Sequence, residues 1–231
     1  MLLWLTDYLS DFVRAFSVFQ YLTLRSMVSA MTALVLSLII GPIFIEKLSR
    51  QQIGQRVRLD GPETHLIKDG TPTMGGGLII VAITIATLFW GDLSNRYIWL
   101  VLSVTCAFGL IGWLDDYLKI CRQSSDGLTA RWKFFWQTFV ALLASFYLYA
   151  TADMAVQTDL IIPFFKEVAL PLGLGFILFS ALMLVGMSNA VNLTDGLDGL
   201  ATVTVFLVAG CFAFISYVTG NIVFSDYLQI P

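Results

Sequence analysis

Two adjacent carboxylates, Asp115 and Asp116, stand directly after an apolar run that ends at Leu114. An acidic side chain at the centre of a bilayer costs roughly 2.5–3.5 kcal/mol on insertion scales, and two neighbouring carboxylates also repel each other. The pair is therefore expected at a membrane surface, where it faces water or binds a cation. A solvated helix end would explain the pair without any chemistry, so its meaning depends on the other polar segments of the chain.

A second polar segment, residues 189–198, also follows an apolar stretch. Its polar residues recur at steps of three, a spacing that places them along one face of a helix. They are Asn189, Asn192, Asp195 and Asp198. Gly196 and Gly199 weaken a helix at this point and let the backbone approach a ligand closely. A broken helix that lines a water-filled cavity suits a substrate pocket, although a solvated turn between two membrane spans fits the same pattern.

The first long polar segment contains glycines, hydroxyl groups and a lysine. Lys68 precedes residues 70–77, which read Gly-Thr-Pro-Thr-Met-Gly-Gly-Gly and open an apolar stretch. Exposed backbone N–H groups, the Thr73 hydroxyl and a lysine at the start of a helix are groups that bind phosphate. Close packing of membrane helices would require the same glycines, and the sequence supports the two interpretations equally.

The composition indicates an all-α polytopic membrane protein. Of the 231 residues, 58% are hydrophobic and only 13% are charged, against about 25% charged residues in a typical soluble domain. Six stretches are apolar enough to approach the roughly 20 residues that a spanning helix needs. They are residues 22–45, 73–90, 97–114, 134–152, 170–187 and 200–218. The loops leave no room for a soluble domain, so we expect one membrane domain over residues 1–231.

Two further elements are expected at the membrane surface. Residues 1–20 carry aromatic residues at nearly helical spacing among charged ones, which predicts an amphipathic helix lying against the membrane. Residues 158–168 include the run Leu-Ile-Ile-Pro-Phe-Phe, which favours a short strand or hairpin.

The positive charges predict the orientation of the chain. Nine of the 13 Lys and Arg residues lie in two loops, five between the first and second spans and four between the third and fourth. The positive-inside rule makes these loops cytoplasmic. The N-terminus and the hairpin near residues 158–168 are then periplasmic, and residues 188–199 face the cytoplasm. Both acidic segments therefore share one compartment, as a single site requires.

Paired carboxylates, a ladder of amides and acids, and a lysine beside glycines suit the chemistry of phosphate groups. Mg²⁺ favours one or two carboxylates together with substrate phosphates. We therefore expect transfer between a soluble phosphorylated donor and a lipid. A carboxylate could accept a proton or hold the metal ion, and the residue types do not choose between these roles.

Three motifs together resemble a known enzyme family. They are Asp115-Asp116-Tyr117, residues 189–200 (Asn-Ala-Val-Asn-Leu-Thr-Asp-Gly-Leu-Asp-Gly-Leu), and residues 60–63 (Asp-Gly-Pro-Glu) with 70–76 (Gly-Thr-Pro-Thr-Met-Gly-Gly). The chain is similar to the phospho-N-acetylmuramoyl-pentapeptide transferases, of the polyprenyl-phosphate N-acetylhexosamine 1-phosphate transferase superfamily (glycosyltransferase 4 family). The resemblance implies Mg²⁺-dependent transfer of phospho-MurNAc-pentapeptide from UDP-MurNAc-pentapeptide to undecaprenyl phosphate, which forms lipid I and releases UMP. It also implies the first membrane step of peptidoglycan synthesis, at the cytoplasmic face of the bacterial inner membrane.

The resemblance also assigns site residues. Asp115 and Asp116 match the acidic pair that lies near the metal ion and activates the lipid phosphate, so they are the expected catalytic and metal-binding residues. Four other positions match residues of the substrate cleft: Lys68, Thr73, Asn192 and Asp195. Three more match the corner that binds uracil: Gly196, Leu197 and Asp198.

The chain departs from the family in length. Family members have further spans, and a later cytoplasmic loop provides a third essential aspartate with a His-rich motif beyond it, which these 231 residues do not contain. We therefore expect the chain to correspond to the N-terminal two-thirds of the family and to be inactive on its own.

Three alternatives stay open. A sister transferase that carries GlcNAc 1-phosphate to the same lipid would share both acidic motifs, although the Thr-Pro-Thr-Met segment argues against it. A transporter with broken helices would place its acids deep within the spans, and a non-catalytic membrane scaffold would bind no donor. The expected partners are the UDP-linked donor, the lipid acceptor and the bilayer, with no nucleic acid. The sequence leaves the oligomeric state open, and a homodimer is one of the alternatives.

Overall fold

The described residues form an almost entirely helical chain. The structure, a computed structural model, describes residues 2–50, 74–122, 127–162, 169–195 and 199–228. These residues are 83% helical and contain one two-stranded sheet, which confirms the all-α expectation. The chain divides into two compact units, Met1–Val140 and Ala141–Pro231, and each is described by itself. The expectation of a single domain stays a prediction.

The N-terminal segment forms two short helices in place of one continuous amphipathic helix. α1 (Leu2–Ser10) is followed by the 3₁₀ helix η1 (Arg14–Gln20). The Ser10 hydroxyl donates to the Asp7 carbonyl oxygen over 2.6 Å, a local bond that competes with continued helix. The Phe19 ring stacks on Trp90 with centroids 5.5 Å apart, so η1 is attached to the first unit's membrane helices.

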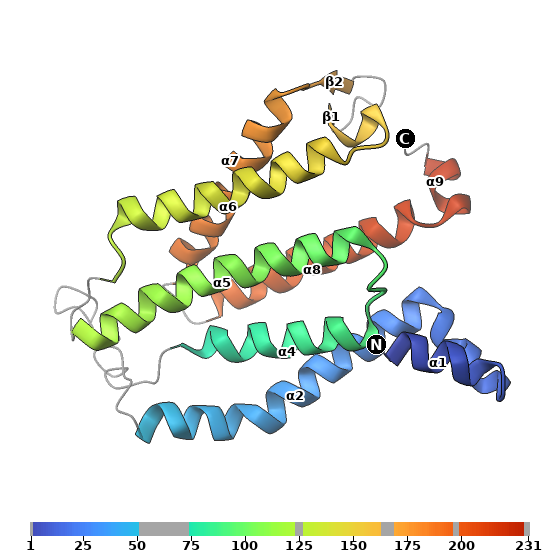
Figure 1. Cartoon of the computed structure of the whole chain (residues 1–231), viewed down its shortest axis with the longest axis horizontal. Helices are drawn as coiled ribbons and strands as arrows, with labels where there is room; N and C mark the ends of the chain where they lie inside the picture. The colour runs from blue at the N-terminus through green and yellow to red at the C-terminus, as the bar shows by residue number, and fades with distance from the viewer. Residues whose placement is uncertain (1, 51–73, 123–126, 163–168, 196–198, 229–231) are drawn as a thin grey trace. The chain divides into compact units, whose positions relative to one another are not determined.

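Three helices lie side by side in the first unit (Figure 1): α2 (Leu22–Arg50), α4 (Gly75–Trp90) and α5 (Arg96–Arg122). The Trp90 indole N–H donates to Thr32 Oγ1 over 3.0 Å and joins α4 to α2. Thr84 Oγ1 lies 3.6 Å from Cys106 Sγ and joins α4 to α5. α4 is therefore the central helix of the three.

Small residues bring these helices close together. Ala82 and Ala86 on α4 are buried. A Cβ at Gly109 of α5 would lie 3.3 Å from Ile80 Cγ1 and would overlap the end of the same side chain. Glycine thus lets α4 reach the α5 backbone, as small residues commonly do between membrane helices. The contact holds α4 against the half of α5 that leads to the acid pair.

The other described residues form three more long helices and one hairpin. α6 (Ala130–Ala150) is followed by the 3₁₀ turn η2 (Ala155–Gln157), β1 (Asp159–Ile161), β2 (Ala169–Pro171), α7 (Gly175–Thr194), α8 (Leu200–Thr219) and α9 (Ile222–Leu228). β1 and β2 pair antiparallel, with Leu160 opposite Leu170. The expected hairpin is confirmed, although its second strand lies just beyond residues 158–168. α7 and α8 contact each other within the second unit.

Four helices of the described residues are long and apolar enough to cross a membrane: Leu22–Ser49, Arg96–Cys121, Gly175–Thr194 and Leu200–Thr219. Six spans were expected. α4 has 16 residues, or about 24 Å, which is less than the roughly 30 Å of the hydrocarbon core. α6 has 21 residues, but Arg131 and Lys133 in its first turn shorten its apolar part. The chain is nevertheless a multi-pass membrane protein.

Candidate functional site

The acid pair lies within a helix and not in a loop. The apolar part of α5 ends at Leu114, but the helix continues to Arg122. Lys119 follows Asp115 by four residues and Asp116 by three, and acid–lysine pairs at these spacings stabilise a helix. The helices extend beyond the expected apolar spans 97–114 and 134–152, since α5 runs through the acids and α6 begins at Ala130.

Asp115 is buried, and its two carboxylate oxygens have different partners. Its side chain is only 13% exposed. Oδ2 lies 2.9 Å from Lys119 Nζ and 3.9 Å from Lys133 Nζ. Oδ1 accepts a hydrogen bond of 2.7 Å from the backbone N–H of Leu128. One carboxylate thus holds the end of α5 against the segment that leads into α6.

Asp116 is more exposed and shares one partner with Asp115. Its side chain is 39% exposed, and its Oδ1 lies 3.1 Å from Lys119 Nζ. The Lys119 ammonium therefore lies between the two acids, in hydrogen-bond contact with an oxygen of each. With Lys133 included, two ammonium groups balance two carboxylates, so the cluster as a whole is neutral.

Gly127 passes directly over this cluster, where a side chain would not fit. A Cβ at this position would lie 2.8 Å from the Asp115 carbonyl oxygen and 2.8 Å from Lys119 Cε, and would overlap the Asp115 carboxylate. Because glycine has no Cβ, the backbone can come close enough for the next residue, Leu128, to donate to Asp115.

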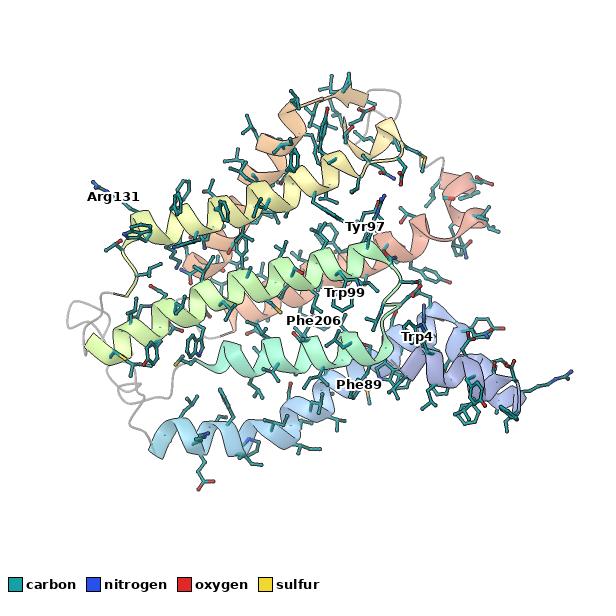
Figure 2. All side chains as sticks on the ribbon, in the orientation of Figure 1. Trp4, Phe89, Tyr97, Trp99, Arg131 and Phe206 are labelled. Atoms are coloured by element: carbon teal, nitrogen blue, oxygen red, sulfur yellow. The ribbon has the colours of Figure 1, made fainter. Side chains whose placement is uncertain are left out.

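Exposed aromatic side chains lie beside the polar cluster. On α5, the rings of Trp113 and Tyr117 stack with centroids 5.3 Å apart. At the start of α6, four exposed aromatic rings contact one another: Trp132, Phe135, Trp136 and Phe139. The neighbouring Arg131 extends away from this helix (Figure 2). Aromatic residues beside basic ones are typical of the membrane–water interface, which is where the acid pair is expected.

The ladder of amides and acids lies at the end of α7, in the second unit. Asn189 and Asn192 are both helical, as the three-residue spacing predicts. The Asn189 side-chain N–H donates to the Val185 carbonyl oxygen over 2.9 Å. Asp195 follows the last helical residue, and both Asn192 and Asp195 are exposed. The two predicted cleft residues of this segment are therefore accessible at the end of a helix.

The remainder of the ladder, residues 196–198, lies outside the described residues. It contains the three positions expected at the uracil corner: Gly196, Leu197 and Asp198. α8 begins directly after Gly199, whose φ of 81° is a conformation that favours glycine. The acid pair belongs to the first unit and the ladder to the second. Their meeting in one site stays a prediction.

The glycine-rich segment is described only from Met74 onward, so Lys68 and Thr73 lie outside the described residues. Met74 has a left-handed φ of 72°, and α4 begins at Gly75. A Cβ at Gly75 or Gly76 would meet no atom within 4 Å. Close helix packing therefore does not account for these two glycines among the described residues, and the phosphate-binding interpretation stays a prediction.

One known protein family matches the part of the chain that contains the acid pair and the ladder. The sequence model of glycosyl transferase family 4 matches residues 98–229, which is more than half of the chain. The chain belongs to glycosyl transferase family 4. This is the family of polyprenyl-phosphate hexosamine-1-phosphate transferases, so the resemblance is confirmed at the level of the family. The acid pair, its two lysines and the ladder lie within the matched residues.

The donor atoms of the acid pair fit the magnesium ion that the resemblance implies. Mg²⁺ is commonly held by one or two carboxylates together with water and substrate phosphates. The Lys119 ammonium shows that a cation fits between Asp115 and Asp116. In the part of the chain that the structure describes, no group of three His, Cys, Asp or Glu side chains is placed to bind a metal. The acid pair is the set of neighbouring carboxylates that the resemblance assigns to the metal ion.

Sequence reasoning missed the residues that hold the acid pair in this family 4 chain. Lys119 could have been found, because its spacing from both acids is that of neighbours on one helix face. Gly127, Leu128 and Lys133 carry no such signal. They approach Asp115 only because the chain turns back after α5, so their role follows from the tertiary structure.

Proposed function

We propose that this member of glycosyl transferase family 4 transfers phospho-MurNAc-pentapeptide from UDP-MurNAc-pentapeptide to undecaprenyl phosphate, with lipid I and UMP as products. The observation that carries the proposal is the acid pair: two carboxylates on one helix, held by lysines, within the residues that match a sugar-phosphate transferase family. The Gly-Thr-Pro-Thr-Met-Gly-Gly segment supports the MurNAc-pentapeptide donor over UDP-GlcNAc.

In the proposed reaction, a phosphate oxygen of the lipid attacks the sugar-bearing phosphorus of the donor. A new P–O bond forms, and the bond between that phosphorus and UMP breaks. Both reactants are anions, so their approach requires positive charge at the site. When bound, Mg²⁺ supplies part of this charge, and Asp115 and Asp116 are the residues that would hold it.

The two acids have different surroundings, which suits different roles. Asp115 is buried and fixed by Leu128 and the lysines, so it positions the end of α5. Asp116 is the more exposed carboxylate and is the one that reactants can approach. An exposed carboxylate can hold a metal ion or accept the proton of the lipid phosphate, and the proposal requires only that Asp116 touch the reacting groups.

The remaining site residues are proposed from the sequence motifs. Lys68 and Thr73 would bind the donor phosphates, and Asn192 and Asp195 would line the cleft. The uracil would lie against three residues: Gly196, Leu197 and Asp198. The proposal therefore requires the end of α7 and the end of α5 to meet in one cleft.

We also propose that the active face is the cytoplasmic face of the bacterial inner membrane. In the first unit, the C-terminal ends of α2 and α5 lie on the same side, as Figure 1 shows. Basic residues near these ends and at the start of α6 include Lys47, Lys119, Arg131 and Lys133. The positive-inside rule supports a cytoplasmic position for this side. The lipid acceptor would then meet the soluble donor at the inner surface.

The test uses membranes that contain the protein expressed from its complete open reading frame. Undecaprenyl phosphate and radiolabelled UDP-MurNAc-pentapeptide should give a lipid-extractable product that is lost in EDTA and restored by Mg²⁺. Asp116→Asn should abolish most of this product. Asp92→Asn, in the loop between α4 and α5, is the matched control and should retain it.

Three results would contradict the proposal in different ways. Product from UDP-GlcNAc in place of UDP-MurNAc-pentapeptide would indicate the sister transferase. The absence of product, together with the absence of binding of either donor, would indicate a scaffold. Undiminished activity in EDTA would contradict the requirement for a metal ion but not the transfer itself.

A further inference from the structure

The acid pair already holds a cation, which is the Lys119 ammonium. Nζ lies 2.9 Å from Asp115 Oδ2 and 3.1 Å from Asp116 Oδ1. The Lys119 side chain is 38% exposed, so it is partly accessible to solvent. Lys133 is farther away, at 3.9 Å, and approaches only Asp115. Of the two lysines, Lys119 alone bridges both acids.

A lysine in this position competes with a divalent cation for the same oxygens. Mg²⁺ binds carboxylate oxygens at about 2.0–2.1 Å and demands near-octahedral geometry. An ammonium that contacts both carboxylates occupies part of that coordination shell, and two cations so close repel each other strongly. A divalent cation that used both acids would therefore have to displace Lys119.

We propose that Lys119 is a resident counter-cation of the acid pair, and that it leaves this position when a divalent cation binds. The inference rests on the proposed metal dependence of the transferase. Lys119 has the means to leave, because its long flexible side chain is partly exposed at the end of α5. Lys133 and Leu128 keep Asp115 in place meanwhile.

The exchange gives the freed lysine a second role. Once released, its ammonium is available to an anionic group beside the metal ion, such as a donor phosphate. The metal ion and the donor would then bind cooperatively. The metal ion releases the ammonium that the donor phosphate binds, and the donor gives the displaced ammonium a new partner. Without a divalent cation, Lys119 keeps the two carboxylates from repelling each other.

Mn²⁺ binding tests the exchange without any measurement of activity. The purified protein from the complete reading frame is titrated with Mn²⁺, and free Mn²⁺ is followed by electron paramagnetic resonance. Lys119→Met keeps the length of the side chain and removes its charge, so it should bind Mn²⁺ about tenfold more tightly than the wild type. Lys119→Arg retains the charge and should not. Lys133→Met should have a smaller effect, because Lys133 contacts one acid only.

Amine labelling provides an independent readout on the unmodified protein. Mg²⁺ should increase the labelling of Lys119 by an acylating reagent, measured by mass spectrometry against Lys47, an exposed lysine on α2. The inference is overturned if Lys119→Met binds Mn²⁺ no more tightly than the wild type, or if Mg²⁺ leaves Lys119 labelling unchanged. It is also overturned if Asp116→Asn does not weaken Mn²⁺ binding. These measurements do not follow lipid I formation, so the proposed transfer is tested separately by the product assay.

Discussion

Substitution of Gly127 by alanine is expected to weaken the candidate site by pushing the connection between α5 and α6 away from it. A Cβ at this position would lie 2.8 Å from the Asp115 carbonyl oxygen, a backbone atom that cannot turn aside as a flexible side chain can. The segment must therefore move. The Leu128 N–H, which lies 2.7 Å from Asp115 Oδ1, moves with it.

The main cost of Gly127→Ala is the loss of a donor from a buried carboxylate. Hydrogen bonds to charged groups contribute about 1.5–3 kcal/mol to stability. For a domain of this length, such a loss corresponds to a fall of roughly 3–12 °C in Tm. If Asp115 must be held in this position for transfer, the rate of lipid product formation should fall by about one to two decades.

Thermal unfolding of the detergent-purified protein and the lipid product assay measure the two effects. The matched control is Gly112→Ala on α5, where a Cβ would meet no atom within 4 Å. Alanine is favoured over glycine within a helix by about 0.5–1 kcal/mol, so this variant should keep or raise the Tm. If Gly127→Ala unfolds at the same temperature and reacts at the same rate as Gly112→Ala, the account of how Asp115 is held is refuted.

Two further predictions concern the acid pair and the orientation. Asp115→Asn should lower the Tm more than Asp116→Asn, because the Asp115 side chain is 13% exposed and the Asp116 side chain is 39% exposed; equal shifts would contradict the role of Asp115 as the buried anchor. With the native cysteines replaced, an impermeant thiol reagent in intact cells should label Gln157→Cys and spare Thr129→Cys, and the opposite pattern would overturn the orientation.

The apolar stretches predicted where the long helices lie but not always where they end. The last long helix was expected over residues 200–218 and is observed over Leu200–Thr219. α5 was expected to end at Leu114, yet it continues to Arg122. Hydropathy reports which residues suit the hydrocarbon, whereas the helix continues as long as the backbone bonds and side-chain pairs favour it. The two boundaries coincide only where a helix stops at the membrane surface.

The candidate site could be predicted in its residue types but not in its contacts. The acid pair and the helical spacing of Asn189 and Asn192 follow from local sequence alone. The difference between a buried Asp115 and an exposed Asp116 does not, because it depends on Leu128, which returns to Asp115 from 13 residues away. Contacts made by such a return of the chain leave no periodic signal in the sequence.

The length of α5 fixes the height of the acid pair relative to the lipid. The helix has 27 residues, or about 40 Å, whereas the hydrocarbon core is roughly 30 Å thick. Tyr97 and Trp99 lie in its first turn (Figure 2) and suit the opposite interface. Asp115, 19 residues after Arg96, is then about 28 Å along the helix, at the boundary between acyl chains and headgroups. In the proposed transfer, bilayer thickness then becomes a variable of the reaction, since a thicker membrane would draw these carboxylates below the level of a lipid phosphate and a thinner one would raise them above it.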